Sequence, residues 1–213
     1  MRLKSGYTGS MKYPAQAKKL IQLLETDQQE VRAAGRLYFH EGKAAHHTEH
    51  TELKRRVHAR AMRMLEVLDD IGEPSISNIG SEAAKAVSIL ATHDGGNTLK
   101  IVLDSFNALY AQNKDEVYYQ AIPAMTDWQL LQEHRPQRFG TQWLFDDDKK
   151  PWLPTVEDFN HVNERRGEYG IEPLRWPKSL AIPETEQPWL GQPLSDLVMR
   201  DMTDAEYTKL APK

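Results

Sequence analysis

Residues 81–91, Ser81-Glu82-Ala83-Ala84-Lys85-Ala86-Val87-Ser88-Ile89-Leu90-Ala91, decide the fold expected for this chain. A helix built from this segment is apolar on nearly all sides, which is typical of a helix at the centre of a domain. Its many alanines let neighbouring helices approach closely. Gly95-Gly96 ends the helix, because glycine readily adopts the left-handed backbone of a helix end. His93 and Asp94 are therefore expected at the end of a buried helix.

Amphipathic helices flank this segment on both sides. From Thr51 onward apolar residues recur at intervals of three and four, which predicts a helix ending near Gly72. Pro14 starts an earlier helix, since proline suits the first turn. Residues 40–50 lack a clear period and are expected to form an irregular connector. Later helices are expected at 97–110, 115–120, 123–132 and 155–170, the last opened by a capping box at 155–158.

The fold class that follows is all-α, with a single orthogonal domain of about six to eight helices over residues 13–170. No alternating strand pattern of useful length occurs in the sequence. Residues 1–12 are expected to form a disordered leader. Eight of the 12 prolines lie from residue 151 onward, so residues 171–213 are expected to form an extended proline-rich tail.

The composition excludes several kinds of chemistry. The 213 residues include no cysteine, which rules out a disulfide framework, an iron–sulfur cluster, a thiolate zinc site and a cysteine nucleophile. The formal net charge of -4 argues against a dedicated nucleic-acid binder. No apolar run approaches the length of a membrane span, and the N-terminus lacks the apolar core of a signal peptide. We therefore expect no membrane partner and a cytoplasmic location.

Five of the eight histidines lie between residues 40 and 58, and His46-His47-Thr48-Glu49-His50 fits the H-x-x-E-H arrangement of inverted zincins. On a helix, His46 and His50 would share a face and could bind zinc, with Glu49 as the base. The expected irregular backbone and the lack of an evident third ligand count against this metal site. A solvated, histidine-rich connector is the favoured interpretation.

A second charged feature is the basic face of the helix that begins near Thr51. This face could contact phosphate or nucleic acid. No aromatic residue lies within it, so a solvated helix face is the favoured interpretation. Its members are Lys54, Arg55, Arg56, Arg60 and Arg63.

The segment Arg135-Pro136-Gln137-Arg138-Phe139-Gly140-Thr141-Gln142 gathers two guanidinium groups, two carboxamides and a hydroxyl around one glycine. Carboxamides in a loop can hydrogen-bond a polar ligand. They can equally tie an irregular loop together internally, and composition alone favours this second role.

This segment resembles the Pro-Gln-x-Tyr-Gly-Thr-Gln signature of a bacterial family of uncharacterised proteins, domain-of-unknown-function family 6624. The resemblance covers roughly residues 20–175 and implies a helical fold with a shared polar site, but no reaction. Three positions depart from the family pattern: Thr92 replaces glutamine, Trp128 replaces arginine and Phe139 replaces tyrosine. The further matches are Asp27-Gln28, Arg32, Gly72, Pro74, Asp94, Thr126-Asp127, Asp158, Asn163, Arg165, Arg166, Gly170 and, in the alanine-rich helix, His93.

The favoured hypothesis is an enzyme or small-molecule binder for a polar or anionic metabolite, of the kind found in biosynthetic pathways. In this hypothesis His93 is the general acid–base, oriented by Asp94 or Asp127. Arg135 and Arg165 would hold an anionic group of the substrate. The cofactor is left open. The other expected ligand-binding residues are Asp27, Gln28, Arg32, Gln137, Thr141, Gln142 and Arg166.

The alternative is a protein-interaction module or homo-oligomer. Its contacts would come from the basic helix face and from the tail, where Trp176 and Trp189 could act as aromatic anchors.

Overall fold

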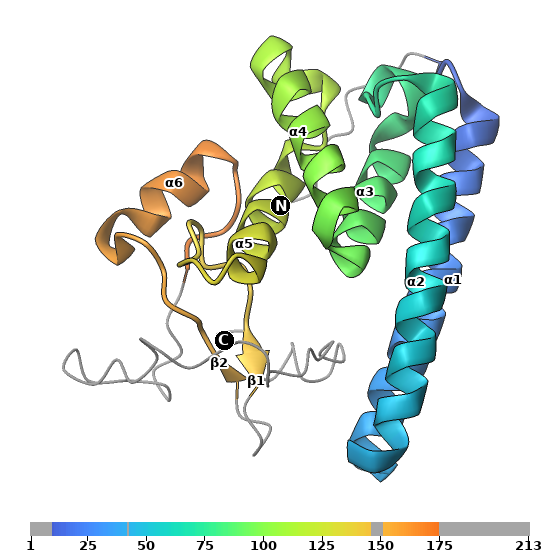
Figure 1. Ribbon diagram of the computed structural model, residues 1–213. Coiled ribbons are helices and arrows are strands. Elements are labelled where there is room, and N and C mark those ends of the chain that lie inside the picture. Colours follow the sequence, from blue (N-terminus) through green and yellow to red (C-terminus); the bar gives the residue numbers. More distant parts are fainter. Residues whose placement is uncertain (1–9, 42, 146–150, 175–213) are drawn as a thin grey trace.

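The computed structural model describes residues 10–41, 43–145 and 151–174 (Figure 1). Of these, the described residues within 35–49, 144–145 and 151–152 are described by their backbone only. The described part is mainly helical, which confirms the all-α class. Short 3-10 turns lie at Lys114–Glu116, Tyr119–Ala121 and Phe159–His161. An antiparallel pair of two-residue strands joins β1, Leu144–Phe145, to β2, Pro151–Trp152. The α-helices of the described residues are α1 Pro14–Glu41, α2 Lys43–Ile71, α3 Ile76–Asp94, α4 Gly96–Gln112, α5 Ile122–Gln132 and α6 Val162–Glu168.

The first three helices pack side by side (Figure 1). α1 and α2 run antiparallel, because Arg60 contacts Asp27 while the earlier Arg56 contacts the later Glu30. α3 runs parallel to α1: the chain near Tyr13 pairs with the start of α3, and His93 at its end contacts Asp27. α3 is shorter, so the α1/α2 hairpin continues past its end (Figure 1).

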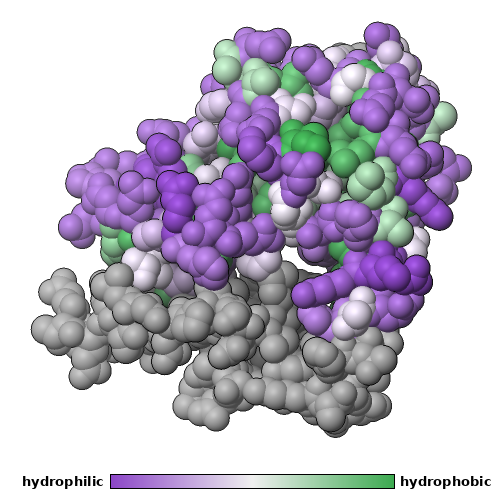
Figure 2. All heavy atoms as spheres, viewed as in Figure 1, coloured by the Kyte–Doolittle hydropathy of each residue, from purple (hydrophilic) through white to green (hydrophobic). Residues whose placement is uncertain are grey.

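α3 lies at the centre of the main core, as its alanine-rich sequence predicts. Ala83, Ala84, Ala86 and Val87 have no exposed surface. Gly80 has a φ of 78° and breaks the helix, so its regular part begins at Ser81, where the sequence placed the start. The visible face in Figure 2 is mainly hydrophilic, with its hydrophobic residues gathered in patches on the upper part.

Two glycines turn the chain from α3 into α4. Gly95 and Gly96 have φ values of 73° and 50°, in the region that favours glycine. Gly96 donates its N–H to Oε1 of Gln132 at the end of α5 (3.0 Å). The buried end of α3 is therefore tied to the second half of the domain at this turn.

The expected irregular connector at residues 40–50 is wrong. α1 continues to Glu41 and α2 begins at Lys43, so the histidine-rich segment has a helical backbone.

The expected capping box at 155–158 is also wrong. Val156 forms a parallel bridge with Gln137, and Asp158 has a left-handed backbone with a φ of 41°. The helix begins later, at Val162. Long-range pairing with the 135–142 loop overrides the local capping signal.

Other expectations fall partly outside the described residues. Residues 1–9 of the expected leader and 175–213 of the expected tail, with Trp176 and Trp189, lie outside them. Lys12 and Tyr13 donate their N–H groups to the carbonyls of Ser77 and Asn78. Within the described ranges, none of the helices combines the length and apolarity that crossing a bilayer requires.

The close packing of α3 generates a stability prediction. Ala84→Leu places three extra carbons where no free surface exists, and we expect the free energy of unfolding to fall by about 1–3 kcal/mol. The neighbouring exposed change Lys85→Leu is the control and should stay within about 0.5 kcal/mol. Urea denaturation measures both; equal effects would contradict a central α3.

Candidate functional site

A buried carboxylate joins the first three helices. Asp27 on α1 has no exposed surface. Its Oδ2 lies 2.5 Å from Nδ1 of His93 on α3, and its Oδ1 accepts a hydrogen bond from Nε of Arg60 on α2 (3.0 Å). The His93 side chain keeps 15% of its surface exposed, while that of Arg60 keeps 8%. The partly exposed His93 ring is thus held by the buried Asp27 carboxylate, which Arg60 also binds.

The helix periodicity explains why these charges are buried. Leu20, Leu24, Val31 and Ala34 follow one face of α1 at intervals of three and four, and Asp27 falls in the same series. Asp27 therefore occupies a position that faces α2.

Arg60 occupies the matching position on α2. It falls in the apolar series of Leu53, Val57 and Met64. Sequence reasoning placed Arg60 on a solvated basic face, and the structure overturns this for Arg60 and Arg56, which contact acids on α1. The spacing of Arg60 from its apolar neighbours was the signal that could have found it.

A second carboxylate extends the network. Oε2 of Glu30 accepts hydrogen bonds from Nη1 of Arg60 (2.9 Å) and from Nε of Arg56 (2.8 Å). Desolvation, the largest single effect on Glu30, raises its pKa, but the bonds and charges of the two arginines together outweigh it and the pKa is lowered. Glu30 therefore stays ionised and holds both arginines against α1.

The end of α3 makes a reciprocal contact with α2. Asp94 Oδ1 lies 3.0 Å from Nδ1 of His58. The Asp94 side chain is 10% exposed and that of His58 is 63% exposed. His93 thus meets an aspartate on α1 while Asp94 meets a histidine on α2, so two imidazole–carboxylate pairs hold the same helix end.

One buried donor in this network lacks an acceptor. Nη2 of Arg60 lies 3.0 Å from Oδ1 of Asp27, but it has no hydrogen-bond partner among the described residues because its N–H bonds point elsewhere. The contact is therefore an ion pair without a second hydrogen bond. A buried pair of this kind stabilises a fold less than apolar side chains of equal size would.

Asp127 on α5 organises a different region. This carboxylate has no exposed surface and accepts four hydrogen bonds from the 135–142 loop. Burial raises the pKa of Asp127, and the donated hydrogen bonds partly offset this rise. The donors are the N–H groups of Arg138 (2.7 Å), Phe139 (2.9 Å) and Thr141 (2.8 Å) and the hydroxyl of Thr141 (2.8 Å).

The carboxamides of the same loop are used internally. Nε2 of Gln137, a fully buried residue, donates to the carbonyls of Gln142 (3.0 Å) and Pro154 (3.4 Å), and its Oε1 accepts from the N–H of Gln142 (2.8 Å). Nε2 of Gln142 donates to the carbonyl of Ala124 (3.2 Å). The carboxamides therefore hydrogen-bond to protein groups and tie the loop together, which is the role that composition alone favoured.

Three of the four arginines expected near a ligand bind protein groups. Arg165 donates to the carbonyls of Arg138, Glu157 and Asp158. Arg166 donates to the carbonyls of Phe139 and Glu172, and burial lowers its pKa despite the opposing charge of Asp127. Arg135 is exposed and pairs with Glu133 (2.9 Å).

The predicted site residues thus form two groups. Within the described part of the chain, no hydrogen bond or ion pair links Asp27, His93 or Asp94 to the residues around Asp127. Gln28 is half-buried beside Asp27, and Arg32 is exposed one turn further along α1. The structure therefore places Asp27, rather than Asp94 or Asp127, against the His93 ring.

The weaker zinc hypothesis receives no support. The side chains of His46 and Glu49 lie outside the described residues, whereas His50 lies within them. Among the described side chains, no group of three or more histidine or acidic residues has the geometry to hold a metal ion.

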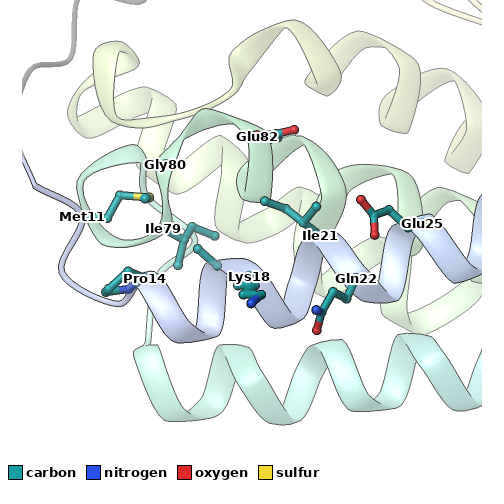
Figure 3. Close-up of a pocket in the computed structure, with 10 residues that line it drawn as sticks. Met11, Pro14, Lys18, Ile21, Gln22, Glu25, Ile79, Gly80 and Glu82 are labelled. Carbon is teal, nitrogen blue, oxygen red and sulfur yellow. The ribbon is translucent and has the colours of Figure 1, made fainter.

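A hollow of about 390 Å³ lies between α1 and α3 (Figure 3). Its lining includes Met11, Ile21, Glu25 and Glu82. Glu82 precedes His93 by three helical turns, about 16 Å at 1.5 Å per residue. The hollow therefore lies near the beginning of α3, away from the histidine.

Comparison with known proteins gives no identification: no family model, no curated protein and no solved structure matches the chain.

The buried ion pair generates a second stability prediction. Arg60→Met leaves the Asp27 carboxylate without its guanidinium partner, and we expect a loss of about 3–5 kcal/mol in the free energy of unfolding. The double variant Asp27→Leu/Arg60→Met should recover most of this loss, because no buried charge remains. Arg63→Met, at an exposed position of α2, is the control. A double variant as unstable as the single one would argue against a direct pair.

A third prediction concerns the 135–142 loop. Asp127→Ala removes the acceptor for four donors, so we expect hydrogen exchange at the amides of Arg138, Phe139 and Thr141 to accelerate by about tenfold or more. Amides of α3 should keep their exchange rates, which makes them the internal control. Unchanged exchange at the three loop amides would show that Asp127 does not hold the loop.

Proposed function

We propose that the chain is an enzyme acting on a polar or anionic metabolite, with His93 as its general acid–base. The observation that carries the proposal is the 2.5 Å contact between Nδ1 of His93 and Oδ2 of the fully buried Asp27. Residues far apart in sequence meet there, and the imidazole remains partly exposed.

The chemistry of the pair supports this role. An ionised carboxylate can only accept hydrogen bonds, so it selects the histidine tautomer with the proton on Nδ1. The lone pair of the neutral ring then lies on Nε2, which has no partner among the described residues. An oriented imidazole with a free Nε2 can take a proton from a bound substrate and later return it.

Arg60 supports the same arrangement by holding the other carboxylate oxygen. With Oδ1 engaged by Arg60 and Oδ2 by His93, the Asp27 side chain has little freedom to rotate. Because a buried ion pair between two helices adds little stability compared with apolar packing, a functional role gives a reason for its presence.

We also propose membership of domain-of-unknown-function family 6624, on the resemblance of the 135–142 segment and of the positions matched elsewhere. In this proposal the signature segment builds the loop that Asp127 holds, while Asp27, Gln28, Arg32 and His93 form the reactive site. A metabolite of a biosynthetic pathway is the proposed substrate.

The alternative of an interaction module has less support. It relied on the basic face of α2, and Arg56 and Arg60 of that face are engaged with Glu30 and Asp27 instead. Its other part, the tail beyond residue 174, lies outside the described residues.

The experiment that tests the proposal reads the tautomer of His93. In long-range ¹H–¹⁵N spectra recorded where the ring is neutral, we expect the proton on Nδ1 in the unmodified protein. Asp27→Asn offers an amide that can donate to Nδ1, so the proton should move to Nε2. The signals of His161, which pairs with Asp158 at the surface, should not change and serve as the control.

A neutral His93 with its proton on Nε2 in the unmodified protein would contradict the proposed general base. His93→Ala should abolish turnover while the helical circular-dichroism signal remains, because the ring is partly exposed. Loss of the folded state in this variant would assign His93 a structural role.

A further inference from the structure

We infer that the His93 site binds a small organic anion, with Arg32 holding the carboxylate or phosphate group and Gln28 lying between Arg32 and His93. This inference rests on the proposed function and adds the class of substrate. It follows from the residues that the two parallel helices α1 and α3 present side by side.

The hollow between α1 and α3 is lined by one stripe of residues from each helix. α1 and α3 start together at Tyr13 and Asn78 and meet again at Asp27 and His93, so they stay in register along this length. Ile21 and Glu25 of α1 point towards α3 beside the hollow, with Glu82 of α3 on its other side (Figure 3).

Helical spacing continues both stripes to the reactive histidine. On α3 the steps from Glu82 lead through Ile89 to His93, at intervals of seven and four. On α1 the same intervals lead from Ile21 to Gln28 and then to Arg32. Gln28 and Arg32 therefore lie on the same face of α1 as Ile21.

α1 extends beyond the end of α3, and Arg32 lies on this extension. α3 ends at Asp94, while α1 continues to Glu41 (Figure 1). Gln28 is half-buried at the level of His93, and Arg32 is exposed about 6 Å further along the helix axis. A ligand that spans about one turn of α1 would contact both Nε2 of the partly exposed His93 ring and the Arg32 guanidinium.

The charges favour an anion at Arg32. Arg60 and Arg56 on α2 are matched by Asp27 and Glu30. Arg32 has no hydrogen bond or ion pair within the described residues. Arg32 is therefore available to bind a ligand. A guanidinium binds carboxylate and phosphate groups by two parallel hydrogen bonds.

The spacing also describes the substrate. Its anionic group would lie roughly one helical turn from the hydroxyl group that gives its proton to His93. In that step the O–H bond breaks, an N–H bond forms at Nε2, and the electron pair stays on the oxygen. Gln28 can donate to or accept from the part of the molecule between these two groups.

The experiment titrates the full chain with inorganic phosphate, and separately with acetate, at constant ionic strength. We expect saturable shifts of the His93 ring signals and of the Arg32 Nε–H signal. Arg32→Gln should weaken binding by about tenfold or more, the effect of losing a charge-assisted pair. Arg63→Gln removes an exposed cation from α2 and should leave the affinity unchanged.

Equal weakening in Arg32→Gln and Arg63→Gln, or shifts that do not saturate, would overturn the inference. Retention of full affinity in Arg32→Gln would also overturn it. The tautomer experiment separates the two proposals. Saturable anion binding with the His93 proton on Nε2 would contradict the general base and support the anion site. A proton on Nδ1 without anion binding would support the general base and contradict the anion site.

Discussion

The arrangement of the first three helices depends on one carboxylate that water does not reach. Asp27 lies where α1, α2 and α3 meet, and each of its oxygens is held by a different helix. Burying a carboxylate costs several kcal/mol unless it is paired, so packing these helices in any other register would leave the charge without partners. The ion pair therefore selects the register of the hairpin and, with it, the position of the His93 ring.

The second half of the domain uses a carboxylate in a different way. Asp127 is buried like Asp27, but most of its partners are backbone N–H groups of one loop. Backbone donors hold a loop in shape and leave no reactive group free, whereas a histidine partner leaves a ring nitrogen available. The two acids are equally buried, but Asp127 holds a loop in shape whereas Asp27 holds a partly exposed histidine.

Much of the fold was predictable because local signals decide it. Ala83, Ala84, Ala86 and Val87 of the alanine-rich segment are fully buried, and Gly95 and Gly72 mark helix ends through their backbone conformations. The helical backbone over residues 40–41 and 43–50 was missed because the sequence there has no clear apolar period. The start of α6 was missed because Val156 pairs with Gln137, which is distant in sequence.

The site was predictable only in part. His93 stood out at the end of a buried helix, but its partner Asp27 was known only as a matched position, and the role of Arg60 depends on which face of α2 meets α1. For the polar groups around Gln137, composition favoured bonds within the loop over bonds to a ligand but did not exclude a ligand. Only the positions of the carbonyls around them decide between these roles.

The turn between α3 and α4 restricts how this protein can change over time. A β-carbon on Gly95 would lie 2.2 Å from Nε2 of Gln132, and the backbone there already disfavours a side chain. The exposed Gln132 side chain can move aside, so the left-handed backbone is the stronger barrier to a larger residue at position 95. Position 95 should therefore stay glycine in descendants of this chain, although it takes no part in the chemistry proposed for His93.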